Sequence, residues 1–457
     1  MSLGSRFYRQ KGRVTMDENE LMGSMKVSKA VAKMAIPSVI SSLVTVVYNM
    51  ADTFFVGQTG DPLQVAAVSL TNPIFILFMA FANMFGMGGS AAASMALGEK
   101  KEKRVKQVSS FITYASLIVG IVFAAILLVG MQPVLQLFGA DADTYELAKG
   151  YTTYISYGAP FIIWSAAASF VVRADGASRE AMAGSMIGTV ANIILDPIFI
   201  SGFGMGAAGA AIATTIGNIM ASVYYFWYFC RKSRNMSMAF RYFKCGDRIL
   251  SQVCSAGLPT AIFSALMSIS TIILNQILVA YGNAPVAAIG IVFKANMFIT
   301  FLQMGLANGV QPLLGYSYGA GNRERFITVE RYTKKCCLIV GVLATALFFF
   351  FREPIIRLFI SDTEVINYGV EMLIAYMISG PVIGILFMNM NCMQSTGNAL
   401  PATILSILRQ GVLLIPVLYG LNALLGLHGV IYGQALTDYV AVLLSIVIWR
   451  WKRRKTL

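Results

Sequence analysis

Charged residues and histidine are scarce in this sequence. Only 12% of its 457 residues are charged, and there is one histidine, His428, whereas soluble domains average about 25% charged residues. Residues 107–140, 249–293 and 372–408 contain no charge at all, and 57% of the chain is hydrophobic. Since a bilayer span needs about 20 mainly apolar residues, each of these runs is long enough for one or two spans. The composition therefore excludes a soluble protein and predicts an all-α integral membrane protein.

Signatures of catalysis and of metal binding are also missing. A single histidine leaves little room for histidine-based catalysis or a histidine metal site. The six cysteines form no C-x-x-C pair, and we interpret them as reduced packing residues. Neither H-E-x-x-H nor a Walker-type G-x-x-x-x-G-K-[ST] occurs. We therefore expect no enzyme and no cofactor, and any transport step must draw its energy from an ion gradient.

The basic residues follow the pattern of membrane topology. Twelve spans are predicted near residues 34–56, 64–93, 107–130, 150–172, 181–200, 207–229, 250–280, 286–315, 333–351, 369–394, 401–421 and 429–449. Thirty of the 35 Lys and Arg residues fall in the tails and alternate loops on one side, against three on the other side. This positive-inside bias predicts a multi-pass protein of the cell membrane with both termini cytoplasmic. It also assigns the net charge of +14 to contacts with anionic lipid rather than with nucleic acid.

The chain repeats itself after a shift of 221 residues. The coinciding pairs are Val65 and Val286, Gly88 and Gly309, Gly98 and Gly319, Pro133 and Pro354, Asp141 and Asp362, Pro160 and Pro381, and Gly176 and Gly397. Because each half holds six spans, both halves enter the membrane from the same side and are related by an axis along the membrane normal. This arrangement places a cavity between two bundles, whose rocking gives alternating access.

Domain limits follow from the repeat and from the polar segments. We predict a cytoplasmic N-terminal tail (1–30), an N-lobe (31–230), a cytoplasmic linker (231–249), a C-lobe (250–450) and a C-terminal tail (451–457). The N-terminal tail is too long and too polar for a cleavable signal. Met16 is a second plausible start, which leaves open whether residues 1–15 are an extension.

Three carboxylates lie deep in predicted spans: Asp52, Asp196 and Asp438. Such groups are costly in a membrane and usually face the bundle interior and serve a function. Asp52 shares a helical face with Tyr48 and Asn49, and Asn192 lies one turn before Asp196.

These residues provide the chemistry of a coupling site. Thr214 and Thr215 lie on the next helix after Asp196. Carboxylate, amide and hydroxyl oxygens suit a proton or a hard cation such as sodium, so the N-lobe residues form a candidate coupling site. The alternative is that each carboxylate is buried for packing and held neutral by hydrogen bonds.

Two further residues within spans have more than one reading. Lys294 forms an ion pair with Asp438, or each of them faces the cavity and serves coupling or substrate binding. Pro37 lies fifteen residues before Asp52 and permits a hinge in that helix. Proline is also common in membrane helices that have no hinge.

The sequence resembles the MATE (multidrug and toxic compound extrusion) family over roughly residues 25–450, in particular its bacterial MepA-like branch. The resemblance rests on A-I-P-S around Pro37, Y-N-M-A-D-T-F-F-V-G around Asp52, N-I-I-L-D-P-I-F-I around Asp196, and Q-P-L-L-G-Y-S-Y-G-A-G-N in the second half. It implies twelve helices in two lobes, and exchange of protons or sodium for amphipathic, often cationic compounds. A monomer is expected.

The resemblance also implies the residues of the coupling site. They are Asp52, Asn192, Asp196, Thr214 and Tyr151, with Tyr154 as an alternative to Tyr151 and Pro37 as the kink. Some family members carry acids in the second lobe, but here those helices hold Lys294 and amides. We therefore place coupling in the first lobe, and place sodium, if it is the coupling ion, at Asp52, Asn192, Asp196 and Thr214. A flippase for a lipid-linked precursor is the alternative function, although its cavity should be rich in Arg and Lys.

Overall fold

The computed structural model describes residues 20–59 and 61–456, and within them the chain is helical and contains no strand. The N-terminal half comprises α2 (Val27–Gly57), α3 (Pro62–Gly98), α4 (Glu102–Val129), α5 (Met131–Leu137), α6 (Tyr145–Ala174), α7 (Ser178–Pro197), the π-helical η1 (Ile198–Gly202) and α8 (Gly206–Arg231). The short η2 (Phe240–Tyr242) lies in the connection. The C-terminal half comprises α9 (Ile249–Val279), α10 (Asn283–Gly319), α11 (Arg323–Phe350), α12 (Arg352–Arg357), α13 (Thr363–Ile378), α14 (Gly380–Ser395), α15 (Ala399–Ile407), the π-helical η3 (Leu408–Leu413), α16 (Leu414–Leu425) and α17 (Leu427–Thr456).

The number of membrane spans agrees with the prediction. Eleven stretches of helix in the described chain are long and apolar enough to cross a bilayer. The pair α13 and α14, bent by 46°, makes a twelfth when it is counted as one span. This tenth span was predicted as one continuous run, 369–394, but the helix bends where Ser379 meets Gly380 and Pro381 because proline cannot complete the preceding hydrogen-bond ladder.

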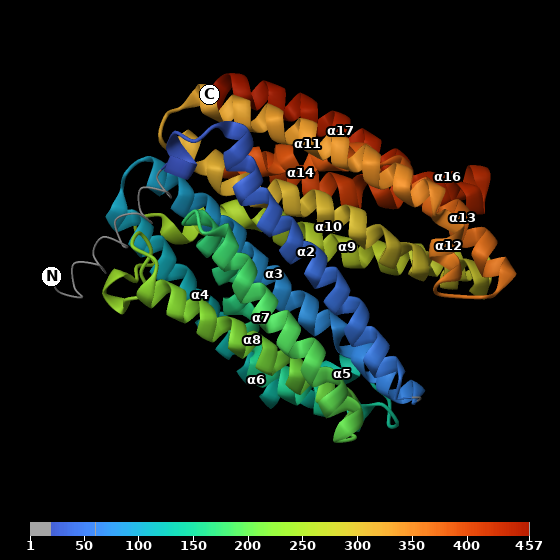
Figure 1. Ribbon diagram of the computed structural model, residues 1–457. Helices are drawn as coiled ribbons and strands as arrows, with labels where there is room; N and C mark the ends of the chain where they lie inside the picture. The colour runs from blue at the N-terminus through green and yellow to red at the C-terminus, as the bar shows by residue number, and fades with distance from the viewer. Residues whose placement is uncertain (1–19, 60, 457) are drawn as a thin grey trace.

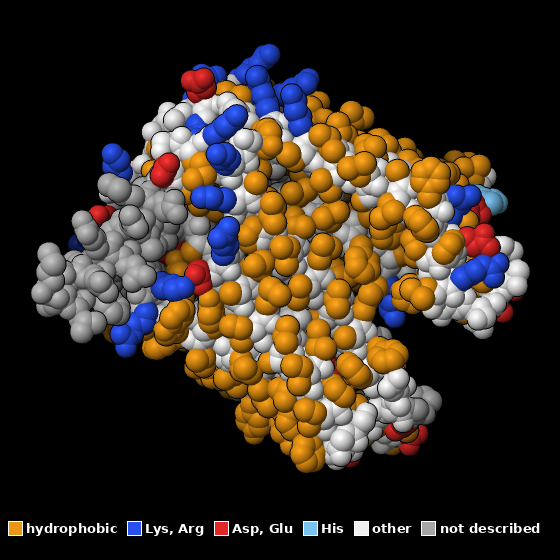
Figure 2. All heavy atoms as spheres, viewed as in Figure 1, with side chains coloured by type: hydrophobic (Ala, Val, Ile, Leu, Met, Phe, Trp, Pro, Cys, Tyr) orange, Lys and Arg blue, Asp and Glu red, His pale blue; other side chains and the backbone are white. Residues whose placement is uncertain are grey.

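The helices form two bundles that meet at one end. Figure 1 shows α2–α8 in one lobe and α9–α17 in the other, packed together at the end where α2 begins and α17 ends, and diverging at the opposite end. Figure 2 shows a notch between the lobes at the diverging end, and Lys and Arg side chains gathered mainly at the end where the lobes meet. The lobes are therefore closed toward the basic end of the molecule and open toward the other.

The seam between the lobes is made by repeat-related glycines. A Cβ added to Gly88 on α3 would lie 1.9 Å from the carbonyl oxygen of Val253 on α9, and one on Gly309 would lie 2.8 Å from Cα of Ala35. Gly98 and Gly319 make a second pair: added Cβ atoms would lie 2.2 and 2.1 Å from main-chain oxygens across the seam. We call these four residues the glycine seam. Only glycine lets the backbones approach so closely.

The predicted repeat is confirmed by matching local structure. The short helices α5 and α12 occupy corresponding places, and Gly176 and Gly397 both adopt positive φ, +89° and +73°. The corresponding carboxylates also act alike: Asp141 accepts from the main-chain N–H of Thr144, and Asp362 caps α13. The residue limits given above for lobes, linker and tails stay predictions.

The segment before α2 is fastened to the C-lobe. Arg325, near the start of α11, donates from Nε to the carbonyl of Met22 (2.9 Å), from Nη1 to Met25 (2.8 Å) and from Nη2 to Leu21 (3.1 Å). Leu21 and Met22 are buried. A strap of chain thus joins the C-lobe to the first helix of the N-lobe at the end where the lobes meet.

Candidate functional site

The N-lobe contains a buried polar cluster that joins three helices. Asp196 lies near the end of α7, with no exposed surface, and Asn192 lies one turn before it. The amide of Asn192 hydrogen-bonds to residues on two helices. Its Nδ2 donates to Oδ2 of Asp196 at 3.1 Å, and its Oδ1 accepts from Thr214 of α8. The hydroxyl of Tyr48, on α2, lies 3.3 Å from Oγ1 of Thr214. Helices α2, α7 and α8 therefore meet at one set of oxygen atoms.

Asp52 and Tyr151 belong to the same cluster. Asp52 is half-buried on α2, with its carboxylate near that of Asp196, and both carboxylates lie near the buried Tyr151 of α6. Tyr154, one turn further along α6, is 37% exposed, and its carbonyl accepts a hydrogen bond from the hydroxyl of Thr215. The structure thus brings together Asp52, Asn192, Asp196, Thr214 and Tyr151, while their role in coupling stays a prediction.

The local sequence explains how Asp196 is presented. Pro197 has no N–H, so the series of main-chain hydrogen bonds of α7 is interrupted directly after Asp196. The chain then changes into the π-helical η1. Such π-segments are frequent at functional sites. Oδ1 of Asp196 is buried and has no hydrogen-bond partner among the described residues. The carboxylate therefore has an acceptor position that a proton or a hard cation can fill.

Two other predicted residues of α2, Pro37 and Asn49, have no tested role. Helix α2 runs unbroken from Val27 to Gly57 through the buried Pro37, so the hinge stays a prediction. The following residue, Ser38, accepts a 3.1 Å hydrogen bond from Nη1 of Arg173 on α6. Asn49 is half-buried on the face that Tyr48 and Asp52 share.

The proposed pairing of Lys294 with Asp438 is wrong. Asp438, buried on α17, pairs instead with Arg409 of η3, whose Nε lies 2.8 Å from Oδ1. Gln434 donates to the same oxygen at 3.0 Å. Lys294 is exposed on α10. Sequence spacing could not show which basic residue would reach Asp438, because Arg409 lies on a different helix, twenty-nine residues earlier.

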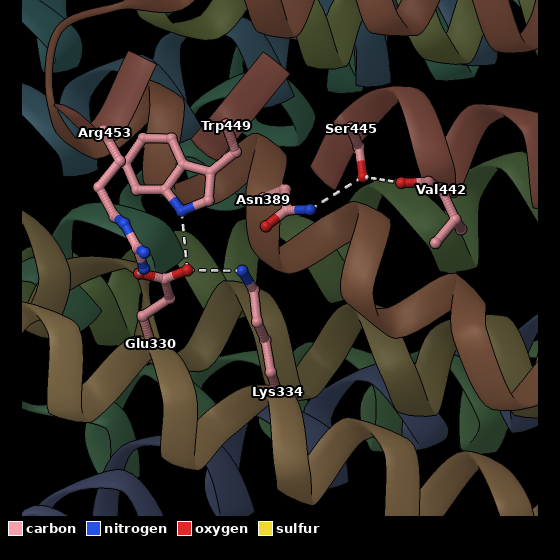
Figure 3. A network of polar contacts seen from close by, with 7 residues as sticks. All are labelled: Glu330, Lys334, Asn389, Val442, Ser445, Trp449 and Arg453. Carbon is pink, nitrogen blue, oxygen red and sulfur yellow. Dashed lines mark hydrogen bonds and ion pairs between the residues drawn. The ribbon is translucent and has the colours of Figure 1, made fainter. Parts of the chain in front are cut away.

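A second polar network, in the C-lobe, was missed by the sequence analysis. Glu330 of α11 is only 2% exposed and binds Nε1 of Trp449 (2.7 Å), Nζ of Lys334 (2.5 Å) and Nη1 of Arg453 (3.3 Å). Figure 3 shows these side chains converging on the carboxylate from α11 and α17. Glu330 was assigned to a loop because the predicted span began at residue 333, whereas α11 begins at Arg323. The network fastens the last helix of the chain to α11.

One hydrolase-like pattern, G-x-S-x-G, occurs at Gly315–Gly319, and the structure argues against a nucleophile there. The pattern lies within α10 rather than on a turn between a strand and a helix. Ser317 is fully buried and donates to the carbonyl of Leu313 at 2.8 Å. Gly319 belongs to the glycine seam, and Gly315 packs against α3, since a Cβ added to it would lie 2.1 Å from Oγ of Ser94.

Comparisons with known proteins agree with this architecture. The MatE family model matches residues 37–198 and again residues 259–419, one stretch in each lobe. The chain is 32% identical to the multidrug export protein MepA of Staphylococcus saprophyticus over 422 residues, which is 92% of this chain and 93% of that protein.

Solved structures agree as well. A crystal structure of MATE in complex with MaD3S superposes with a TM-score of 0.91 at 26% identity, over 96% of this chain and 98% of that one. The outward-facing conformation of a multidrug resistance MATE family transporter of the MOP superfamily has a TM-score of 0.88 at 25% identity, over 95% and 97% of the two chains.

Proposed function

The chain belongs to the MatE family, and on that basis we propose that it is a multidrug efflux transporter of the cell membrane. Its twelve apolar spans suit a multi-pass carrier, and its basic end suits the cytoplasmic side. Both termini are then cytoplasmic, and the notch between the lobes opens to the outside. A single chain contains both lobes and the polar cluster, so a monomer is sufficient.

The observation that carries the mechanism is the N-lobe cluster of Asp52, Tyr151, Asn192, Asp196 and Thr214. Its two carboxylates, one fully buried, interact across α2 and α7. Two acids held together in a poorly solvated interior exchange protons, or share a cation, more readily than isolated surface carboxylates. We propose that a proton or a sodium ion enters this cluster as a compound leaves.

Coupling requires that occupancy of the cluster changes the arrangement of the lobes. Asp52 and Tyr48 lie on α2, and the same helix packs against Gly309 of α10 at the glycine seam. Binding of an ion to Asp52 and Asp196 changes the contacts of α2, and α2 can pass that change to the seam. Alternating access then consists of closing the outer notch while parting the seam.

The exported compounds are amphipathic and often cationic. Two carboxylates in the N-lobe attract positive charge, and the apolar side chains around them accept aromatic and aliphatic parts. Adaptable surfaces of this kind bind many ligands. The alternative, a flippase for a lipid-linked precursor, needs a cluster of bases to hold pyrophosphate. The bases deep within the predicted spans, Lys294 and Arg409, are too few to form such a cluster, which disfavours that alternative.

The function is tested with purified protein in liposomes loaded with a fluorescent cationic dye. Proton and sodium gradients are imposed separately, each in the direction that drives exchange. Dye movement that responds to one gradient, and that dissipates it, supports cation-coupled export. Dye movement that responds to neither gradient rules out coupling, and movement of a lipid-linked pyrophosphate without dye movement identifies the flippase.

A further inference from the structure

Arg409 is a buried charged group of the C-lobe. It lies in the π-helical η3, and its side chain is only 8% exposed. Its single ionic contact in the described chain runs from Nε to Oδ1 of Asp438, whose side chain is 5% exposed. Because Gln434 donates to the same oxygen, Asp438 is held toward Nε. The pair is therefore one-sided and leaves the outer edge of the guanidinium unused.

That outer edge carries an unsatisfied donor. Nη1 of Arg409 is buried and has no hydrogen-bond partner among the described residues. A guanidinium has five N–H donors in a planar fork, and the edge formed by its two terminal nitrogens matches a carboxylate. Leaving a buried charged donor without an acceptor is costly. An acceptor supplied by a bound molecule would remove that cost.

The surroundings hold the guanidinium in place and offer aromatic surface. Its central carbon lies 5.2 Å from the ring centroid of Phe263 on α9 and 5.9 Å from that of Phe387 on α14. The two rings are arranged edge to face. The hydroxyl of Ser270 donates to the carbonyl of Gln410 and so fixes the π-segment that carries Arg409. An aromatic acid would find both a donor and ring contacts here.

Arg409 and Asp438 lie on spans that correspond, in the repeat, to spans of the N-lobe cluster. These are the eleventh and twelfth spans, which are the repeat partners of the spans that carry Asp196 and Thr214. In both lobes the fifth span contains a π-segment, η1 or η3. The N-lobe site presents unpaired oxygen, and the C-lobe site presents unpaired N–H. The two lobes thus offer opposite polarity on repeat-related spans, although the 221-residue shift aligns Arg409 with Gly188, about two helical turns before Asp196.

We propose that Arg409 anchors a second binding subsite, which takes the carboxylate of an aromatic compound. This proposal rests on the proposed export function and deepens it: the transporter accepts zwitterions as well as cations. Asp438 and Gln434 position the guanidinium, and Phe263 and Phe387 contact the ring system of the ligand.

The test uses two dyes that differ only at the acid. Rhodamine 110 carries a free carboxylate, and rhodamine 123 is its methyl ester. Binding to the purified full-length protein is measured by fluorescence anisotropy for the natural chain, for Arg409→Lys and for the exposed control Arg323→Lys. Arg409→Lys keeps a positive charge opposite Asp438 and removes the terminal guanidinium donors.

The expected result is a loss of at least tenfold in rhodamine 110 affinity for Arg409→Lys, with rhodamine 123 affinity within twofold and no change for Arg323→Lys. Benzoate should displace rhodamine 110, but not rhodamine 123, from the natural chain, a measurement that does not depend on the variant folding. Equal affinity of Arg409→Lys and the natural chain for rhodamine 110, equal loss of both dyes, or no effect of benzoate overturns the subsite. A natural chain that binds rhodamine 123 alone overturns the subsite but not export, whereas one that binds neither dye overturns both.

Discussion

Alanine at Gly88 should force the lobes apart at the glycine seam. The added Cβ would lie 1.9 Å from the carbonyl oxygen of Val253, and contacts under 3.0 Å are essentially never seen, so α3 and α9 must separate by about 1 Å. Both partners are backbone, which cannot turn away as a side chain can. Overpacking of this kind costs about 1–3 kcal/mol. Since about 1.4 kcal/mol is a factor of ten, the closed arrangement should lose population roughly five- to 150-fold.

The same reasoning ranks three variants. At Gly309 the nearest atom would be at 2.8 Å, so Gly309→Ala should have a smaller effect of the same sign. At Gly290, on the same helix, no atom of the described residues would lie within 4 Å of the added Cβ, and Gly290→Ala is the matched control.

The separation can be measured between spin labels on cysteines at the exposed positions 103 and 331, one in each lobe, in protein whose native cysteines are replaced. Double electron–electron resonance should show a longer distance gaining population in the order Gly88→Ala, Gly309→Ala, Gly290→Ala. An unchanged distance distribution in folded Gly88→Ala would refute the account of the seam.

Two further variants test the C-lobe contacts. Glu330→Ala removes a buried carboxylate and leaves Lys334 and Arg453 without their partner, so the free energy of unfolding should fall by about 3 kcal/mol. Thermal unfolding in detergent measures this change. Glu324→Ala, at an exposed position, should change the stability little. Arg325→Ala removes three charge-assisted hydrogen bonds to the strap before α2, so trypsin should cleave after Lys26 about tenfold faster than in the natural chain. If cleavage speeds up equally in Arg323→Ala, the strap is not held by Arg325.

The sequence predicted the architecture well because membrane spans and internal repeats leave strong, local signals. Charge-free runs mark the spans, and the 221-residue register aligned Gly88 with Gly309, which both pack closely against a helix of the other lobe. The residues proposed for the N-lobe cluster also converge, since helical spacing and family resemblance both pointed to α2, α7 and α8. A bend such as that between α13 and α14 has a weaker signal, because glycine and proline also occur in straight membrane helices.

Contacts between distant helices could not be predicted in the same way. The pairing of Asp438 with Arg409 depends on the π-segment η3, and nothing in the hydrophobic pattern marks such a segment. Glu330 could not be recognised as a buried residue because a charge just before a predicted span is typical of a loop. Its burial depends on Trp449 and Arg453, which lie more than 100 residues further along the chain. Lone charges near span ends therefore need the three-dimensional arrangement before they can be interpreted.

The central claim, that coupling lies in the N-lobe cluster, is tested most directly by gradient-driven dye transport in liposomes for Asp52→Asn and Asp196→Asn. Each variant removes a carboxylate but keeps its shape, and the exposed Asp143→Asn is the control. The account predicts that both cluster variants bind dye, yet lose the response of transport to the coupling gradient by at least tenfold, while the control transports normally. Transport by Asp196→Asn that follows the gradient as strongly as in the natural chain would contradict it.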